Sequence, residues 1–283
     1  MRNLVYVSIS LIVLTFLFSI KREDFKVIEN YHQSQFFEYH KLIESQPESK
    51  EKVELDYVLG GVVPHHMPIT IPLLIEFYSK LKNTREVETF IILGPDHVNR
   101  GKGKINVSKA VFVTPFAKMH PNLGIIEELE KSGFVVHDER SFEIEHSIDS
   151  QVLLISKFFP DALIVPLTFH SSTSSKNARK LGGILDEIVS DKVFLVASVD
   201  FSHYLPEDQA KPLDYLSLNV LSSLNSKFKG LVEADSTQAL STLIYFLEKR
   251  KADNYSDLRV FNTSDFSSNH DFTTGYISGF FGR

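Results

Sequence analysis

The 283-residue chain contains no cysteine and no tryptophan. Without cysteine it can form no disulfide, no thiolate metal ligand and no cysteine nucleophile. It also lacks the GxSxG sequence of many serine hydrolases, and neither of the glycine-rich phosphate-binding patterns, GxGxxG and GxxxxGK[ST], occurs. These absences remove covalent acyl transfer through such motifs and the common nucleotide-binding loops from the candidate functions.

A long basic stretch is also missing. The chain carries 30 Lys and Arg residues against 36 Asp and Glu residues, a formal net charge of −6. Proteins that bind nucleic acid usually present a basic face, so we expect no nucleic-acid partner. A small molecule or a peptide is the partner that the composition leaves open. With 43% hydrophobic and 23% charged residues, the composition is that of an ordinary globular protein.

One long hydrophobic run stands at the N-terminus, from Leu4 to Ile20, with Arg2 before it and Lys21-Arg22 after it. As a helix it would span about 26 Å, just under the ~30 Å hydrocarbon core of a bilayer. We therefore predict that residues 1–22 are a transmembrane anchor or a signal segment. An uncleaved signal anchor is favoured over a cleaved peptide, because Phe18-Ser19-Ile20 lacks the small-x-small pattern of a cleavage site. The prediction is a membrane-anchored, extracytoplasmic protein.

Two further regions follow the hydrophobic segment. Residues 23–54 are polar and charged, and we predict a helical stalk in which His32 and His40 face solvent. Residues 55–283 are predicted to form one α/β domain, a length that suits a single core.

Strand and helix patterns alternate through this domain. Short apolar, β-branched runs predict buried strands at Tyr57–Val63, Thr89–Leu93, Ala110–Val113, Ala162–Phe169, Val193–Val199, Leu258–Asn262 and Thr273–Phe281. Helical spacing predicts helices at Ile69–Lys82, Leu123–Ser132, Ile148–Phe159, Ser174–Val189, Glu207–Leu224 and Ser236–Lys251. Apolar strands separated by amphipathic helices indicate a mostly parallel central sheet with helices on both faces.

Histidines and carboxylates gather near the ends of the predicted strands. The clusters are Pro64-His65-His66, Gly94-Pro95-Asp96-His97, Asp200-Phe201-Ser202-His203 and, before a predicted helix, Glu143-Ile144-Glu145-His146. In open α/β sheets the ligand crevice lies beyond the carboxyl ends of the strands, so these clusters should meet along one edge. Two histidines and a carboxylate with open positions suit non-haem Fe(II). The same groups could carry out acid–base chemistry without metal, because histidine titrates near neutral pH.

Each of these residues also has a purely structural interpretation. Asp200 could cap a turn, and His146 could pair with Glu143 or Glu145 at the surface. Function is favoured for His65, His97, and the Asp200–His203 pair, and structure for His66. The remaining domain histidines lie outside the clusters, and no functional role is predicted for His120, His137, His170 and His270.

Four sequence motifs, in order, resemble those of one family. They are VVPHH, IILGPDH, EHSIDSQVLL followed by FFPDALIVPL, and ASVDFSHY. This order resembles the Memo family, which includes the AmmeMemoRadiSam system protein B type, and the likeness runs from about Leu59 to the C-terminus. The resemblance implies a fold related to the class III extradiol dioxygenases, which use Fe(II) at the edge of an α/β sheet.

The resemblance also implies site residues. His65, His97 and His203 match the family's site histidines, Asp200 its site aspartate, and His146 the histidine of its EHS motif. Many relatives place a cysteine just before the penultimate helix. This chain has Val232-Glu233-Ala234-Asp235-Ser236 there, so Asp235 would replace the cysteine or would only cap the following helix.

These assignments lead to a predicted metal site. His65 and His97, with His203 or Asp235, would bind a divalent metal, while Asp200, His146 and His203 are the candidate catalytic residues. Carboxylate favours harder metals than thiolate does, so Fe(II) is favoured, with Cu or Zn as alternatives. The predicted function is a Memo-like redox or dioxygenase-like protein. A non-catalytic module that binds a peptide or small molecule, and a metal-assisted hydrolase, remain the competing interpretations.

Overall fold

A computed structural model describes residues 30–133, 135–224 and 231–283. Residues Tyr31–Arg283 group into one compact unit. The predicted N-terminal hydrophobic helix, Leu4–Ile20, lies outside the described residues. Within the described ranges, no helix combines the length and apolar character that crossing a bilayer requires.

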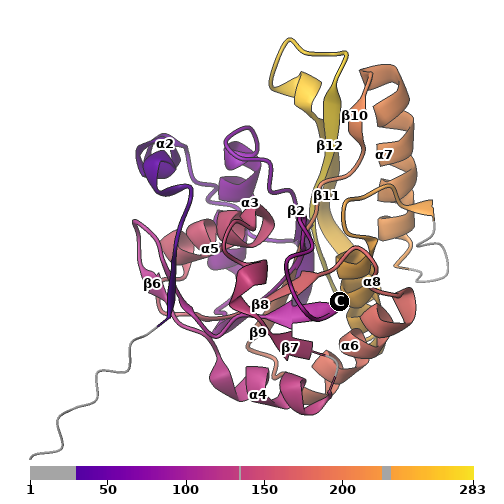
Figure 1. Cartoon of the computed structure of the whole chain (residues 1–283). Coiled ribbons are helices and arrows are strands. Elements are labelled where there is room, and N and C mark those ends of the chain that lie inside the picture. The colour runs from indigo at the N-terminus through magenta and orange to yellow at the C-terminus, as the bar shows by residue number, and fades with distance from the viewer. Residues whose placement is uncertain (1–29, 134, 225–230) are drawn as a thin grey trace, which may run out of the picture. The chain divides into compact units, whose positions relative to one another are not determined.

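The unit contains seven α-helices and twelve strands within its described residues (Figure 1). The helices are α2 His40–Ser45, α3 Ile71–Thr84, α4 Leu123–Lys131, α5 His146–Phe158, α6 Ser175–Ile188, α7 Glu207–Ser222 and α8 Thr237–Lys249. The strands are β1 Tyr31–Gln33, β2 Val58–Val63, β3 Thr89–Pro95, β4 Ile105–Val107, β5 Val111–Val113, β6 Lys118–Met119, β7 Val135–His137, β8 Leu163–Phe169, β9 Val193–Ser198, β10 His203–Leu205, β11 Asn254–Asn262 and β12 Thr273–Gly282.

A nine-stranded mixed sheet forms the centre, in the order β10-β12-β2-β9-β3-β8-β4-β7, with β11 on the outer side of β12. Its middle strands β2, β9, β3 and β8 are parallel, whereas β12 and β4 run antiparallel to their inner neighbours β2 and β8. The middle strands are apolar runs because helices cover both of their faces. The α/β fold with a parallel centre is therefore confirmed, and the strand next to the centre on each side, β12 or β4, runs antiparallel to it.

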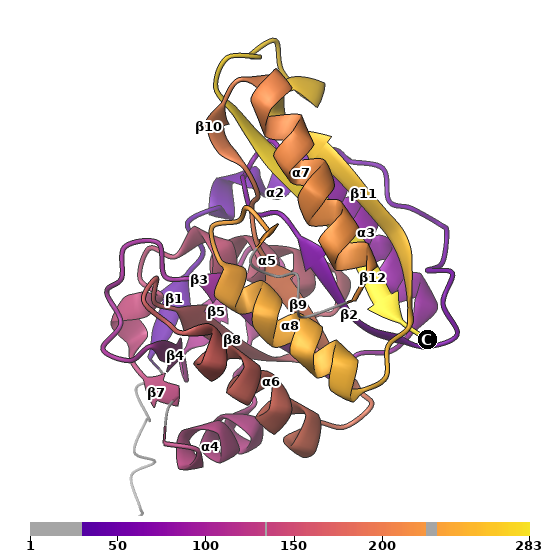
Figure 2. The ribbon, with the colours of Figure 1, turned by 90° about the vertical axis from the view of Figure 1, so that its right-hand side faces the viewer.

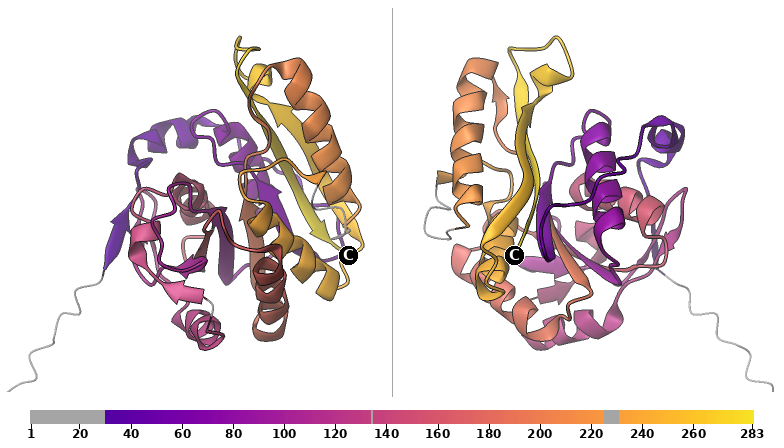
Figure 3. Two further views of the ribbon diagram at one scale, coloured as in Figure 1. Left: turned by 45° about the vertical axis from the view of Figure 1, so that its right-hand side comes forward. Right: turned by 180° about the vertical axis from the view of Figure 1, so that it is seen from behind.

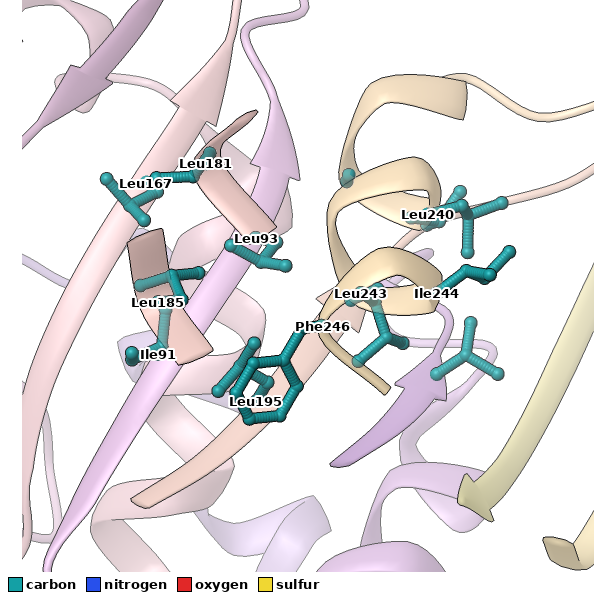
Figure 4. Close-up of a cluster of buried hydrophobic side chains, with 14 of the residues drawn as sticks. Ile91, Leu93, Leu167, Leu181, Leu185, Leu195, Leu240, Leu243, Ile244 and Phe246 are labelled. Carbon is teal, nitrogen blue, oxygen red and sulfur yellow. The ribbon is translucent and has the colours of Figure 1, made fainter. Parts of the chain in front are cut away.

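Helices pack on both faces of the sheet, as predicted. One face is covered by α4, α6 and α8, which stand in front of the sheet in Figure 2. Leucine and isoleucine side chains of β3, β8 and β9 interdigitate there with those of α6 and α8 (Figure 4). The opposite face is covered by α3 and α5, together with α2 and the small β1-β5-β6 sheet. Helix α7 runs beside β11 and β12, as both views of Figure 3 show.

The predicted stalk over residues 23–54 needs correction for its described part. Strand β1 pairs in parallel with β5, and Ile43 of α2 is fully buried in the core beneath α3 and α5. His32, expected to face solvent, is instead hydrogen-bonded through its Nε2 atom to Oε2 of Glu139 at 2.7 Å. The domain therefore begins near residue 31 rather than at residue 55, because a few apolar side chains anchor an otherwise polar segment.

Candidate metal centre

The order of strands in the sheet brings the polar clusters together. His65 follows β2, Asp200 follows β9 and His97 follows β3, and these three parallel strands are immediate neighbours. Their carboxyl ends therefore meet at one edge of the sheet. His146 is the first residue of α5, and Asp235 directly precedes Ser236, the N-cap of α8. Segments that are remote in the sequence thus converge at a single point.

Three imidazoles form the centre of this cluster. One nitrogen of each of His65, His97 and His146 lies within 4.8 Å of the corresponding atoms of the other two. The His97 and His146 rings stack with their centroids 4.2 Å apart, and His65 meets both edge-on at 5.2 and 5.1 Å. Imidazole nitrogens converging in this way could hold a metal ion.

Asp235 places a carboxylate beside two of these imidazoles. Its Oδ2 atom lies 3.1 Å from Nε2 of His65 and 3.6 Å from Nε2 of His97. Its Oδ1 atom is buried and has no hydrogen-bond partner among the described residues. A buried carboxylate oxygen without a partner is costly, and a cation bound by Asp235 would offset that cost. The donor set therefore fits a divalent metal held by imidazole and carboxylate.

Glu145 fixes the orientation of His97. Its carboxylate accepts a hydrogen bond from Nδ1 of His97 at 2.8 Å and another from the His97 backbone N–H at 2.9 Å. The same carboxylate caps α5 by accepting from the backbone N–H of Ser147. Because the Nδ1 proton is used by Glu145, the Nε2 atom of His97 is left to face Asp235 and the cluster centre.

Asp200 joins the two ligand loops. Its Oδ1 atom accepts from the backbone N–H of His65 at 3.0 Å, and its own backbone N–H donates to Oδ2 of Asp235 at 3.3 Å. The backbone N–H of Asp235 donates in turn to the carbonyl of Asp200. Burial raises the pKa of Asp200, although nearby His65 opposes the shift. Asp200 is therefore a carboxyl group that can hold a proton close to the imidazoles.

The carboxylates make two of the imidazoles strongly basic. Burial lowers the pKa of His97, but its hydrogen bonds to Asp235 and Glu145 outweigh burial and raise that pKa to about 10. Burial is outweighed in the same way at His65, whose pKa is raised by Asp200 and Asp235. Without metal, the cluster is thus held by ion pairs between imidazolium and carboxylate groups.

His146 behaves in the opposite way. Burial, together with positive charge on His65 and His97, lowers the pKa of His146 to about 4. It is therefore the imidazole that stays neutral and offers a lone pair in the neutral pH range.

A hollow of about 390 Å³ opens beside the cluster. Besides the three imidazoles, Asp200 and Asp235, it is lined by His66, His203, Tyr204 and Thr274. His203 lies at this wall and is not part of the group of three converging imidazoles. Nδ1 of His66 is hydrogen-bonded to the hydroxyl of Tyr276 at 2.6 Å, and burial lowers the pKa of His66. The hollow therefore joins candidate metal ligands to neutral hydrogen-bonding groups.

The structure thus brings His65, His97 and His146 to one point, with Asp235 beside His65 and His97, and Asp200 next to them. Two features were missed from the sequence. Glu145 was treated as a surface partner of His146, although its position before an apolar helical run is a capping signal. Among the wall residues, Tyr204 ends the ASVDFSHY motif but was given no role, and Thr274 lies in no motif.

The site residues lie in a stretch of the chain that matches a known protein family. The model of the family described as Memo-like protein matches residues 30–276. The chain belongs to this family. A MEMO1 family protein of Pyrobaculum aerophilum is 28% identical over 238 residues, which cover 80% of this chain and 84% of the relative. A MEMO1 family protein of Methanobrevibacter smithii is 27% identical over 239 residues, with the same two coverages. Among solved structures, an uncharacterized Escherichia coli K12 protein is similar at a TM-score of 0.48 and 14% identity, covering 77% of this chain and 99% of its own.

Proposed function

We propose that this Memo-like protein binds a divalent metal ion through His65, His97 and His146, with Asp235 as a fourth ligand. The observation that carries the proposal is the convergence of one nitrogen each from His65, His97 and His146 within 4.8 Å, with Oδ2 of Asp235 lying 3.1 Å from Nε2 of His65. The sequence pattern had named His203 or Asp235 as the third ligand, and the convergence of the side chains supports His146 as a further ligand in place of His203. His203 is proposed to contact the bound substrate from the wall of the hollow.

The proposed metal is Fe(II). Imidazole and carboxylate ligands with open coordination positions suit non-haem iron, and no thiolate is present to favour Cu(I). A bound iron would supply Lewis acidity and redox chemistry, and the proposed activity is a redox or dioxygenase-like reaction. Zn and Cu are the alternative metals.

The surrounding residues would perform the remaining tasks. Glu145 holds the ring of His97 so that Nε2 faces the centre. Asp200, whose pKa is raised by burial, would store or deliver a proton at its carboxyl group. The hollow of about 390 Å³ would hold a small molecule or the side chains of a peptide.

Elemental analysis of the full-length chain tests this proposal. The protein would be purified anaerobically in mild detergent beside a His65→Ala/His97→Ala double variant. A His120→Ala/His170→Ala double variant, altered at histidines outside the cluster, is the matched control. Near-stoichiometric iron in the wild type and the control, lost in the first variant, is the expected result. No metal in the wild type after reconstitution would contradict it.

A metal-free binding module is the second candidate function. The observation in its favour is that Asp235 and Glu145 already form ion pairs with His65 and His97. In that case the pocket would bind a peptide or small molecule without metal. Tight ligand binding that is unchanged by a chelator would favour this function over the first. Turnover of esters with Zn or Mn would instead indicate a metal-assisted hydrolase.

We also propose that residues Leu4–Ile20 anchor the protein in a membrane, with the domain on the extracytoplasmic side. The support is the apolar sequence itself, flanked by Arg2 and Lys21. Resistance of the protein to alkaline extraction, together with digestion of the domain by protease added to intact cells, is the expected result. Release of a shortened, soluble form would show a cleaved signal peptide instead.

A further inference from the structure

A chain of hydrogen-bonded side chains leads from the interior to His65. It links Tyr78 on α3, Gln151 on α5 and Ser198 at the end of β9, and it ends at Nδ1 of His65. All four side chains are buried, with at most 1% of the surface of each exposed. Polar groups at such depth are stable only when every donor meets an acceptor, so the direction of each bond can be worked out.

Two backbone carbonyls fix these directions, because a carbonyl can only accept. The Nε2 atom of Gln151 lies 2.9 Å from the carbonyl oxygen of Pro64, so the amide group must point its NH₂ there. The same NH₂ donates to Oγ of Ser198 at 2.9 Å. The amide oxygen of Gln151 then accepts from the hydroxyl of Tyr78 at 2.9 Å, which burial keeps protonated by raising the pKa of Tyr78.

The second carbonyl belongs to Ser147 and lies 2.6 Å from Oγ of Ser198. Ser198 must donate its only hydroxyl proton to that carbonyl. Its oxygen has already accepted one bond from Gln151, and its remaining lone pair faces Nδ1 of His65 at 3.3 Å. The bond between Ser198 and His65 is therefore satisfied only when Nδ1 of His65 carries the proton and donates it.

We propose that Ser198, held by Gln151 and Tyr78, is a positioning residue that keeps the proton of His65 on Nδ1 and so directs the Nε2 lone pair into the metal centre. Nε2 is the atom that faces Oδ2 of Asp235 at 3.1 Å. Gln151 and Ser147 lie on α5, the helix that begins with His146. The chain of hydrogen bonds therefore also sets the position of His65 relative to His146, a second candidate ligand. The expected effect of Ser198 on metal affinity rests on the proposed metal centre. The position of the proton on His65 rests on the hydrogen bonds alone.

Zinc titrations of the full-length protein test the effect on affinity. Substituting residues that orient a metal-bound histidine typically costs about 10- to 100-fold in metal affinity, and we expect a loss of that size in Ser198→Ala. Ser198→Thr keeps the hydroxyl and should restore most of the affinity. Ser156→Ala is the matched control, because Ser156 is an equally buried α5 serine that bonds Thr114 and Leu153 away from the cluster. The zinc affinity of Ser156→Ala should stay within about twofold of the wild-type value.

Nitrogen-15 NMR of labelled histidines gives a second measurement, which a loss of stability alone would not change. In the zinc-loaded protein, His65 should show a proton on Nδ1 and metal on Nε2, and the Nδ1 proton should move upfield in Ser198→Ala. Metal on Nδ1 in the wild type, or equal affinities in Ser198→Ala and Ser156→Ala, would overturn the inference. If Ser198→Ala does not fold, Tyr78→Phe is measured in its place. A smaller loss of zinc affinity is then expected, and an unchanged affinity would overturn the inference.

A wild-type protein that binds no zinc or iron would count against the metal centre itself. The ring signals of His65 in the metal-free protein would then decide the positioning role separately. A bonded Nδ1 proton that shifts in Ser198→Ala would uphold it, and an Nδ1 proton that is absent or unaffected would overturn it.

Discussion

The Nε2 atom of His65 lies 3.1 Å from the Oδ2 atom of Asp235, so a carboxylate stands beside the candidate imidazole ligands. The substitution Asp235→Cys should therefore convert an imidazole–carboxylate site into an imidazole–thiolate site. Because thiolate favours soft metals, we expect the Cu(I) affinity relative to Fe(II) to rise by about tenfold or more, equivalent to about 1.4 kcal/mol.

Anaerobic competition titrations with a chromophoric Cu(I) chelator would measure this change. Asp235→Asn is the control, since it keeps the shape of the side chain and removes the charge, and it should weaken both metals. Equal or tighter binding of Cu(I) than of Fe(II) in the wild type would count against the preference proposed here.

Replacing His146 and His203 separately distinguishes a ligand from a residue of the pocket wall. His146→Ala removes one of the three converging nitrogens and should lower the iron content to a small fraction of wild type. His203→Ala alters the wall of the hollow and should leave iron content near wild type, while weakening whatever substrate is bound. Elemental analysis of the two variants gives the answer. Loss of metal in His203→Ala with retention in His146→Ala would reverse the assignment.

Asp149 should make the stability of the domain depend on pH. Burial raises its pKa from 3.8 to about 6, although the backbone N–H of Gln35 donates to its Oδ2 at 2.7 Å. A carboxyl group with a higher pKa in the folded state binds its proton more tightly there, so the free energy of unfolding falls as pH rises from about 4 to about 6. Asp149→Asn removes this loss and should stabilise the protein at pH 7.5 by up to about 3 kcal/mol, with little change at pH 4.

Denaturant unfolding of the full-length chain at the two pH values would measure the effect. Asp161→Asn is a suitable comparison, because Asp161 is an exposed aspartate. Its substitution should change the free energy of unfolding little at either pH. A difference between Asp149→Asn and wild type that is the same at both pH values would contradict the assignment to the titration of Asp149.

Gly275 should not tolerate a side chain. A Cβ atom there would lie 2.1 Å from Oδ2 of Asp214, whose carboxylate holds the backbone N–H and the hydroxyl of Ser202, one residue before His203. Gly275→Ala should therefore destabilise the protein by about 1–3 kcal/mol and displace the wall of the hollow. Gly124→Ala, in α4 where a Cβ meets only ordinary contacts, should instead stabilise by about 0.4–1 kcal/mol. Thermal unfolding measures the stability of both variants. A Gly275→Ala variant as stable as the wild type would contradict the tight contact with Asp214.

The middle of the sheet could be predicted because buried parallel strands are continuous apolar runs. Strands β2, β3, β8 and β9 all lie within or close to their predicted ranges. Strands β1, β4, β6, β7 and β10 were missed, since two or three residues are usually too few to show a period. The antiparallel direction of β4 beside β8 could not be predicted either, because composition does not encode the direction of a strand.

The site was predictable to the level of its loops. Polar residues that follow apolar strands had to meet at the carboxyl edge, and His65, His97 and Asp200 do. His146 was not predicted as a ligand, because its approach to His65 and His97 depends on where α5 begins in space. The same limit applied to Glu145, whose hydrogen bond to His97 joins two segments that no local pattern connects.

The four candidate ligands come from four separate segments of the chain, and the last of them, Asp235, stands at the start of α8 near the end of the domain. A nascent chain that has not yet released α8 from the ribosome therefore presents only the histidines, without the carboxylate opposite them. A metal that needs the complete set of proposed ligands would consequently be acquired only after the segment around Asp235 has left the ribosome. For a chain exported across a membrane, the ion would be drawn from the compartment in which folding finishes.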